Sequence, residues 1–345
     1  MSTPTPWLIE HGRTIGGDQT FVIAEVGSNH DQSLDLAFES IDAAAEAGAD
    51  AVKFQSLQMD ALYYDPPEDV QELYAKIDLE EDWHAKLKSH CDEKGVIFFS
   101  SPTYLGAVDL LRSLEVSLFK LASAQVGTFP QLVERVAAQG TPTILSTGLV
   151  SYGELERTVE SFRRHNNDRF AILHCNSIYP TPFERVHLPL METYREMFDC
   201  PVGFSDHTPD IFAPLGAVAR GACIIEKHFT LSRDLSTPDA SISIEPDGFE
   251  RMVKGIRAVE KTLTPALRTD IEPEEENFKE SIRYRLVLDK EKEAGSEFGT
   301  TDFRFLRHDH GVDCRDVRNV IDHMQAKQPL SKGSLLEWSH LEGKE

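Results

Sequence analysis

An eightfold alternation of short apolar runs and longer helical patterns constrains this chain more than any other feature of its sequence. The first unit pairs FVIAEVG with SLDLAFESIDAAAEAG, and the last pairs ACIIEK with GFERMVKGIRAVEKTL. Eight such units fit within about 240 residues, which is typical of a TIM barrel rather than an open doubly wound sheet. We therefore predict an α/β fold with a TIM (β/α)8 barrel over residues 18–264, in which a long loop follows the second strand, DAVKFQ.

The segments on either side of the predicted barrel have different patterns. Residues 1–17 contain alternating apolar residues around a Gly-Gly turn, which predicts an N-terminal hairpin that plugs one end of the barrel. Residues 265–280 are rich in Pro and Glu and are typical of an exposed linker. Residues 281–345 contain short strand patterns and turns, and they predict a small, β-rich second domain.

Composition limits the class of protein and its partners. A chain of 345 residues with 40% hydrophobic content can bury a barrel-sized core. Its formal net charge of −23 argues against nucleic acid and anionic membranes as partners. No apolar run is long enough for a membrane span, and the N-terminal segment lacks a signal-peptide core, so we expect a cytoplasmic protein. The five cysteines lack CxxC spacing, which predicts reduced thiols rather than disulfides or a zinc site.

Two histidines follow consecutive predicted strands. His207 follows VGFSD and His228 follows ACIIEK, with a helix-length segment between them. Neighbouring parallel strands end at the same edge of a sheet, so both imidazoles are expected at the carboxyl end of the barrel. Ser205 and Glu226 would share that face, while Lys227 would point the other way. Imidazole with oxygen ligands suits Mn, Fe, Co or Zn; the alternative is two unrelated histidines at strand ends.

Most other predicted strands also end in polar residues. Lys53 and Lys120, with several hydroxyl groups, would meet at the barrel mouth and predict a pocket for a small, multiply charged anion such as a phosphorylated carboxylate. Two alternatives stay open: the lysines are ion-paired to neighbouring carboxylates, or Lys120 forms a Schiff base as in a pyruvate-type aldolase. The polar residues near these strand ends are Glu25, Ser28, Asn29, His30, Lys53, Gln55, Ser100, Ser101, Lys120, Ser123, Ser146, Thr147, His174, Asn176, Ser177 and Tyr179.

Several of these segments together resemble one known family. They are FVIAEVGSNHDQSLDLAFESIDAAAEAGADAVKFQ, SSP, FKLAS, LSTG, LHCNSIYPTPFE, VGFSDHT, GAVARGACIIEKHFTL and TPD. The chain from about Asp18 to its end is similar to the sialic acid synthase family, in which a TIM barrel is followed by an antifreeze-like (SAF) domain. The resemblance implies that the substrates are phosphoenolpyruvate and an N-acyl amino sugar, which condense to a nine-carbon 2-keto acid and phosphate.

The resemblance also implies roles for individual residues. The metal ligands would be His207 and His228, with Mn²⁺ as the usual metal. The catalytic residues would be Glu25, Lys53, Lys120 and Glu226. The substrate contacts would be Gln55, Ser101, Ser123, Ser146, Ser177, Tyr179, Ser205, Asp239 and Arg307. A domain-swapped homodimer is implied as well, in which Arg307 completes the active site of the partner.

The chain departs from the family pattern at a few positions. Ser177 stands where bacterial sialic acid enzymes have an asparagine, and Gln125 stands where many members have a glutamate. Arg307-His308-Asp309 replaces Arg-Pro-Gly in the second domain. Because of these changes, the sequence defines the class of reaction better than it defines the sugar substrate. N-acetylmannosamine is favoured by the IYPTP element; the alternatives are legionaminic or pseudaminic acid synthesis from a diacetamido-trideoxyhexose, or an inactive carbohydrate-binding protein.

Overall fold

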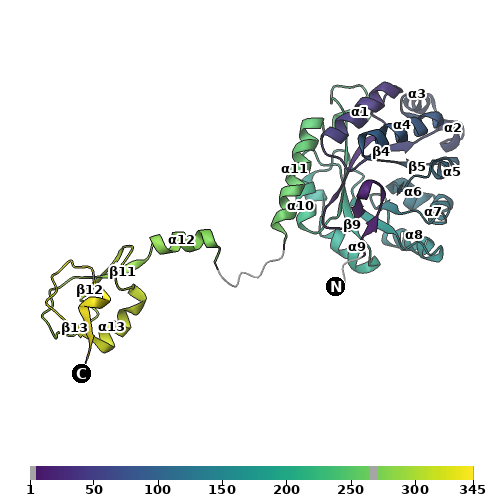
Figure 1. Cartoon of the computed structure of the whole chain (residues 1–345). Helices are drawn as coiled ribbons and strands as arrows, with labels where there is room; N and C mark the ends of the chain where they lie inside the picture. The colour runs from purple at the N-terminus through teal and green to yellow at the C-terminus, as the bar shows by residue number, and fades with distance from the viewer. Residues whose placement is uncertain (1–4, 265–270, 345) are drawn as a thin grey trace. The chain divides into compact units, whose positions relative to one another are not determined.

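A computed structural model describes residues 5–264 and 271–344 of the chain. The chain divides between Thr264 and Pro265 into two compact units (Figure 1). The first unit contains the eight parallel strands and their helices, and the second contains short antiparallel pairs. No helix in the described part of the chain is long and apolar enough to cross a membrane.

The first unit is the predicted TIM barrel. Its strands are β3 (Phe21–Gly27), β4 (Ala51–Ser56), β5 (Ile97–Pro102), β6 (Phe119–Leu121), β7 (Thr143–Ser146), β8 (Phe170–Cys175), β9 (Val202–Asp206) and β10 (Ile224–His228). Apart from β5 and β6, neighbouring strands in the chain pair in parallel, and β10 pairs with β3. Because β5 and β6 also lie side by side, the sheet closes on itself. The predicted fold class is therefore confirmed.

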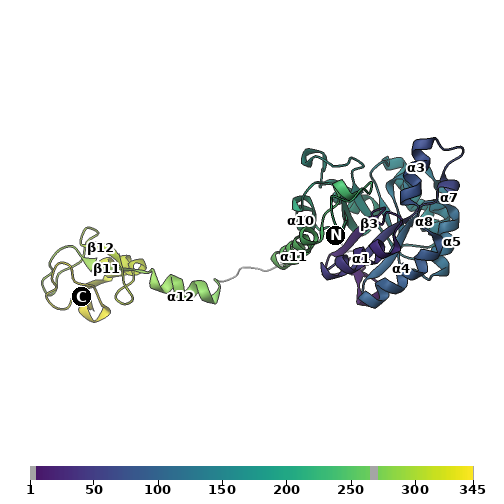
Figure 2. The ribbon, with the colours of Figure 1, turned by 90° about the horizontal axis from the view of Figure 1, so that it is seen from above.

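The helices lie outside the strands (Figures 1 and 2). They are α1 (Leu34–Glu46), α4 (Glu81–Lys94), α5 (Leu105–Ser113), α6 (Ser123–Thr128), α7 (Pro130–Ala137), α8 (Tyr152–Arg164), α9 (Leu190–Phe198), α10 (Phe212–Ala219) and α11 (Pro246–Thr262). In α8, a capping box of Ser151 and Glu154 starts the helix, and Leu155, Val159 and Phe162 form a buried stripe. The short helix α6 is an element that the sequence did not predict.

The expected long loop after β4 contains two further helices, α2 (Met59–Leu62) and α3 (Glu68–Ile77). In α3 the apolar residues Val70, Leu73, Tyr74 and Ile77 recur at helical spacing, although only Ile77 is buried. Glu68 and Asp69 in its first turn also favour the helix through the backbone dipole. The expected long loop therefore overlooked a helical pattern that the sequence contains.

An N-terminal hairpin closes one end of the barrel. Strand β1 (Trp7–Leu8) pairs antiparallel with β2 (Thr14–Ile15), and Trp7 and Ile15 are buried against Phe21 and Ile224 at the start of the barrel strands. The pair lies within residues 1–17, where the sequence pattern placed a hairpin. Its turn contains the 3-10 helix η1 (Glu10–Gly12) rather than the Gly-Gly pair that was expected to form it.

The second unit contains two small antiparallel pairs around its own apolar core. Its elements are α12 (Pro273–Ser281), β11 (Tyr284–Leu288), β12 (Phe303–Arg307), η4 (Cys314–Asp316), α13 (Val317–His323), β13 (Met324–Ala326), η5 (Trp338–His340) and β14 (Leu341–Gly343). β11 pairs with β12, and β13 pairs with β14. Helix α12 falls within the predicted linker, whose residues 265–270 lie outside the described part of the chain. All five cysteines are free thiols in the structure.

Candidate active site

Two lysines and two glutamates form a buried ion-pair network inside the barrel. Lys53 Nζ lies 3.1 Å from Glu25 Oε2 and 3.3 Å from Glu226 Oε2. Lys120 Nζ contacts both oxygens of Glu226, at 2.7 and 2.9 Å. These four residues come from β3, β4, β6 and β10, so the network spans the barrel interior. The four formal charges cancel, and an anionic ligand entering here competes with Glu226 for both ammonium groups.

Burial and charge act in opposite directions on these groups. Burial raises the pKa of the Glu226 carboxyl, but the adjacent Lys120 and Lys53 outweigh it and hold that pKa well below its usual range. Burial also lowers the pKa of Lys53, yet the carboxylates of Glu226 and Glu25 raise it on balance. Lys120 shares its single carboxylate with a second ammonium, so burial prevails and its pKa is lowered. Glu226 is therefore held as a carboxylate.

Neighbouring polar side chains orient the two glutamates. Gln55 donates a hydrogen bond from Nε2 to Glu25 Oε1 over 2.7 Å. Ser205 donates from Oγ to Glu226 Oε1 over 2.9 Å. Each glutamate thus has one hydrogen-bond donor in addition to its lysine partners. Such fixed partners reduce the reorganisation that a reacting site would otherwise need.

A group of serines lines the next part of the barrel interior. Among the described residues, the buried hydroxyls of Ser101 and Ser146 have no hydrogen-bond partner. Ser123 Oγ accepts the backbone N–H of Gly148 at 2.9 Å. A Cβ at position 148 would lie 2.3 Å from Ser177 Oγ, so only glycine leaves the space between these serines open. These two hydroxyls are therefore free to donate a hydrogen bond to a molecule that enters the barrel.

The two predicted metal ligands lie together. The ring centroids of His207 and His228 are 5.3 Å apart, and Tyr179 stacks near His207 with a centroid distance of 4.2 Å. Nδ1 of His207 lies 2.7 Å from the carbonyl oxygen of Asn176. Donation to this carbonyl leaves Nε2 of His207 as the lone-pair nitrogen. Nδ1 of His228 has no hydrogen-bond partner and lies 3.7 Å from Asp239 Oδ2.

These imidazoles fit a divalent metal. Burial and the proximity of His228 lower the pKa of His207 to about 3, so its ring is neutral near pH 7. Neutral imidazole is the form that binds a metal, and the carbonyl of Asn176 fixes the ring in the way typical of a metal ligand. Two nitrogen donors leave further coordination positions for water or substrate oxygens.

Asp239 joins the histidine side of the site to the glutamate side. It precedes the 3-10 helix η3 (Ala240–Ile242), and its Oδ2 accepts a hydrogen bond from Ser28 Oγ at 2.9 Å. A Cβ at Gly27 would lie only 3.2 Å from Asp239 and 3.3 Å from both Gln55 and Glu25. Gly27 also has φ of +55°, a conformation that other residues seldom adopt. The sequence did not single out Gly27 or Gly148, because glycine has no functional side chain that would indicate a site.

Several of the predicted polar residues of the barrel, among them His30 and His174, do not join this group. His30 packs edge-on against Trp83, and His174 stacks on Phe204, so both lie in the layer between strands and helices. Arg307 lies on β12 of the second unit, where its guanidinium is 5.4 Å from the ring centroid of Tyr284. Its predicted contact with a barrel site stays a prediction.

The sequence profile of the NeuB family matches residues 40–267. The chain belongs to the NeuB family. It is 33% identical to N,N'-diacetyllegionaminic acid synthase of Campylobacter jejuni, over 90% of this chain and 96% of that protein. It is 31% identical to pseudaminic acid synthase of the same species, over 90% and 93% of the two chains. The crystal structure of N-acetylneuraminic acid synthetase from Leptospira borgpetersenii is similar, with a TM-score of 0.74, 32% identity and coverage of 80% and 96%.

In this NeuB-family barrel, an outward-facing ion pair supports the two strands that carry the histidines. Lys227 of β10 contacts the carboxylate of Asp206 on β9, and both side chains are buried. The Lys227 ammonium also donates to the carbonyl of Thr208 at 2.7 Å. Asp206 accepts the backbone N–H of Thr208 at 2.9 Å. The pair therefore fixes the backbone on both sides of His207.

Replacing Lys227 with methionine is expected to lower the free energy of unfolding by about 3–5 kcal/mol, because it leaves the Asp206 carboxylate buried without its cation. Urea unfolding followed by circular dichroism measures this loss. The matched control is Lys86→Met, which breaks the exposed pair Lys86–Asp82 and should change stability by about 0.5 kcal/mol or less. Equal urea midpoints for the two variants would contradict the assignment of Lys227.

Proposed function

We propose that the chain condenses phosphoenolpyruvate with N-acetylmannosamine to give a nine-carbon 2-keto sugar acid and phosphate. Membership of the NeuB family makes it a phosphoenolpyruvate-dependent, carbon–carbon bond-forming enzyme. One observation carries the proposal: a deep cluster of two lysines and unpartnered serine hydroxyls lies in the same barrel interior as two paired imidazoles. This combination suits one anionic substrate and one substrate with a carbonyl to be polarised.

The lysine and serine cluster is assigned to phosphoenolpyruvate. The ammonium groups of Lys53 and Lys120 neutralise its carboxylate and phosphate, and the free hydroxyls of Ser101 and Ser146 donate to its oxygens. When the anion binds, Glu226 loses part of its contact with the two lysines. Ser123 and Ser177, which face the open space beside Gly148, complete this side of the pocket.

The histidine side is assigned to the amino sugar. His207 and His228 would hold the divalent metal on which sialic acid synthases depend, Mn²⁺ in our proposal, and the bound ion supplies a Lewis acid for the aldehyde oxygen of the open-chain sugar. Tyr179 is 51% exposed and offers its ring and hydroxyl to the sugar. Asp239 and the second unit's Arg307 are assigned to sugar hydroxyl and acyl groups.

The chemistry places C3 of phosphoenolpyruvate against the aldehyde carbon, and positioning supplies much of the rate. The new carbon–carbon bond leaves positive charge at C2, which the carboxylate of Glu25 stabilises. Water adds at C2, and the resulting tetrahedral centre expels phosphate. Glu226 contacts two ammonium groups and stays charged, whereas Glu25 contacts only Lys53. We therefore propose that Glu25 accepts a proton from the attacking water, which balances the proton that the aldehyde oxygen takes up as it becomes a hydroxyl.

A panel of amino sugars tests the function directly. Each sugar is incubated with phosphoenolpyruvate and Mn²⁺, and phosphate release and product mass are measured. We expect the highest kcat/KM with N-acetylmannosamine. The similar legionaminic and pseudaminic acid synthases make diacetamido-trideoxyhexoses the second candidates. Phosphate release with none of these sugars would contradict the proposal.

The bond that breaks in phosphoenolpyruvate is a separate prediction. The pocket holds the phosphate with ammonium and hydroxyl groups while the reaction takes place at carbon, so the carbon–oxygen bond should break. Phosphoenolpyruvate labelled with ¹⁸O at the bridging position is therefore expected to give labelled phosphate and an unlabelled keto acid. Mass spectrometry of both products, before carbonyl exchange with water, measures this. Label in the keto acid, or equal turnover with pyruvate, would rule the mechanism out.

We also propose that the enzyme is a domain-swapped homodimer in which Arg307 reaches the barrel of the partner subunit. Strand β12 carries the exposed apolar residues Phe305 and Leu306 immediately before Arg307. Because neighbouring residues of a strand face opposite sides, Phe305 shares its face with Arg307 and offers an apolar contact beside it. Arg307 would then reach the barrel site of the partner subunit, and an apolar contact would form beside it.

A further inference from the structure

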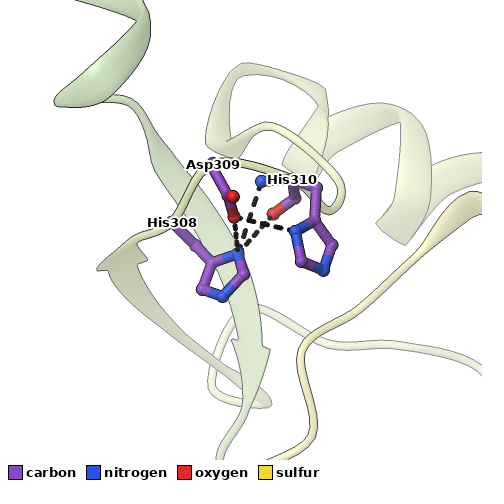
Figure 3. A group of neighbouring side chains, drawn as sticks. All are labelled: His308, Asp309 and His310. Carbon is purple, nitrogen blue, oxygen red and sulfur yellow. Dashed lines mark hydrogen bonds and ion pairs between the residues drawn. The ribbon is translucent and has the colours of Figure 1, made fainter.

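A histidine–aspartate–histidine sequence in the second unit brings three potential metal ligands together. His308, Asp309 and His310 follow directly after β12, and their ligand atoms lie within 4.8 Å of one another (Figure 3). Asp309 Oδ1 is 2.8 Å from Nδ1 of His308 and 2.8 Å from Nδ1 of His310. The carboxylate oxygen therefore lies between two imidazole nitrogens. All three side chains are exposed to solvent.

These separations approach those of ligands on one metal ion. Nitrogen and oxygen ligands bind zinc at about 2.0–2.2 Å, so two adjacent ligands on the same ion are about 3.0–3.4 Å apart. A shift of a few tenths of an ångström would open the present 2.8 Å contacts enough to admit an ion. Flexible, exposed side chains make such a shift inexpensive.

The backbone below this cluster is fixed by a buried arginine. Arg285 of β11 donates from Nε to the carbonyl oxygen of His308 at 3.2 Å and from Nη2 to that of Asp309 at 3.3 Å. Nη1 of Arg285 is in turn bonded to Asp313 Oδ2 at 3.0 Å. The three ligands are thus presented by a supported turn rather than by a free loop. A supported first shell is what a binding site requires.

Glu337 supplies an outer partner for one of the imidazoles. Its Oε1 lies 3.8 Å from Nε2 of His310, the ring nitrogen opposite the one that faces Asp309. A metal-bound histidine usually directs its second ring nitrogen to a carboxylate, which orients the ring and strengthens the ligand. Glu337 has this position relative to His310.

From these contacts we infer that His308, Asp309 and His310 bind a divalent transition metal, with Glu337 as the outer partner of His310. Two imidazoles and one carboxylate favour Zn²⁺, Ni²⁺ or Cu²⁺ over Mg²⁺ and Ca²⁺, which prefer oxygen ligands. Water completes the coordination because the site is exposed. This site is separate in sequence and in ligands from the His207–His228 pair of the barrel.

Zinc binding to the full chain tests the inference. The protein is freed of metal, dialysed against Zn²⁺ at pH 7.5, and its bound zinc is measured by elemental analysis together with its affinity by calorimetry. The double variant His308→Ala/His310→Ala is expected to bind one zinc per chain fewer than the wild type. The variant His207→Ala/His228→Ala should retain the zinc held by the second unit. These two variants distinguish this site from the one in the barrel.

Three further variants test whether the change in zinc binding comes from this cluster. His323→Ala removes another exposed histidine of the second unit and should leave the zinc content unchanged. Asp309→Asn keeps the shape of the turn and should still lower the affinity, and Glu337→Gln should lower it about tenfold or more. Circular dichroism verifies that each variant is folded. Equal zinc content in the wild type and the folded His308→Ala/His310→Ala variant would overturn the inference.

Discussion

Replacing either His207 or His228 with alanine is expected to lower kcat/KM by more than about 10²-fold, because loss of an outer partner of a metal ligand alone costs about 10–100-fold. Each histidine supplies one of two imidazole nitrogens in the barrel, so its removal leaves one. Phosphate release from phosphoenolpyruvate and N-acetylmannosamine, with Mn²⁺ and with a chelator, measures the effect.

The control for this experiment is His165→Ala, which removes an exposed histidine paired with Glu134 on the outside of the barrel. It should retain wild-type turnover. Both histidine variants should remain folded, since the two rings lie at the carboxyl ends of β9 and β10 rather than in the middle of the strands. A His207→Ala enzyme with full activity in chelator would remove the metal from the mechanism.

Arg307→Ala and Lys53→Ala are each expected to be inactive alone and to recover activity when their subunits are mixed. In a domain-swapped dimer, one site of each heterodimer contains both an intact Lys53 and an intact Arg307. Random re-association of equal amounts makes about half of the dimers heterodimers, so about one quarter of the sites should be restored. Initial rates after denaturation, mixing and refolding measure the recovery.

Arg304→Ala is the matched control for this experiment, because Arg304 is another exposed arginine on the same strand, β12. It should keep wild-type activity. Subunit exchange is followed by native mass spectrometry of differently tagged chains. Exchange without recovery of activity would mean that Arg307 acts within its own chain or has no role at the barrel site.

The barrel was predictable because its strands are buried on both faces. The seven consecutive buried residues of β3 are apolar apart from Glu25, and helices such as α8 have a clear apolar stripe. Helix α3 was missed although Val70, Leu73, Tyr74 and Ile77 recur at helical spacing in its sequence. The hairpin pairing followed from the alternating pattern, but its turn did not, since Gly16 and Gly17 are not its turning point.

The side of each strand on which a residue lies was also predictable. Alternation along β9 and β10 places Ser205 and Glu226 together inside the barrel and directs Lys227 outward to Asp206. The partners within the barrel were not predictable, because they join strands that are distant in the sequence. Lys120 and Glu226 are 106 positions apart, and their contact depends on the closure of the barrel. The ion pairs of the first alternative are present in the structure, whereas the anion pocket at the same lysines stays a prediction.

The hairpin that seals the base of the barrel has a consequence for kinetics. With Trp7 and Ile15 filling one end, ligands approach the lysines from the strand ends that carry the histidines. Lys120 is 1% exposed, whereas Tyr179 at the histidines is 51% exposed. On the function proposed above, the phosphorylated substrate occupies the deeper position and the sugar then covers it. We infer a compulsory order of addition, in which phosphoenolpyruvate binds first. Excess sugar should then inhibit the enzyme, because sugar bound at the entrance blocks the binding of phosphoenolpyruvate.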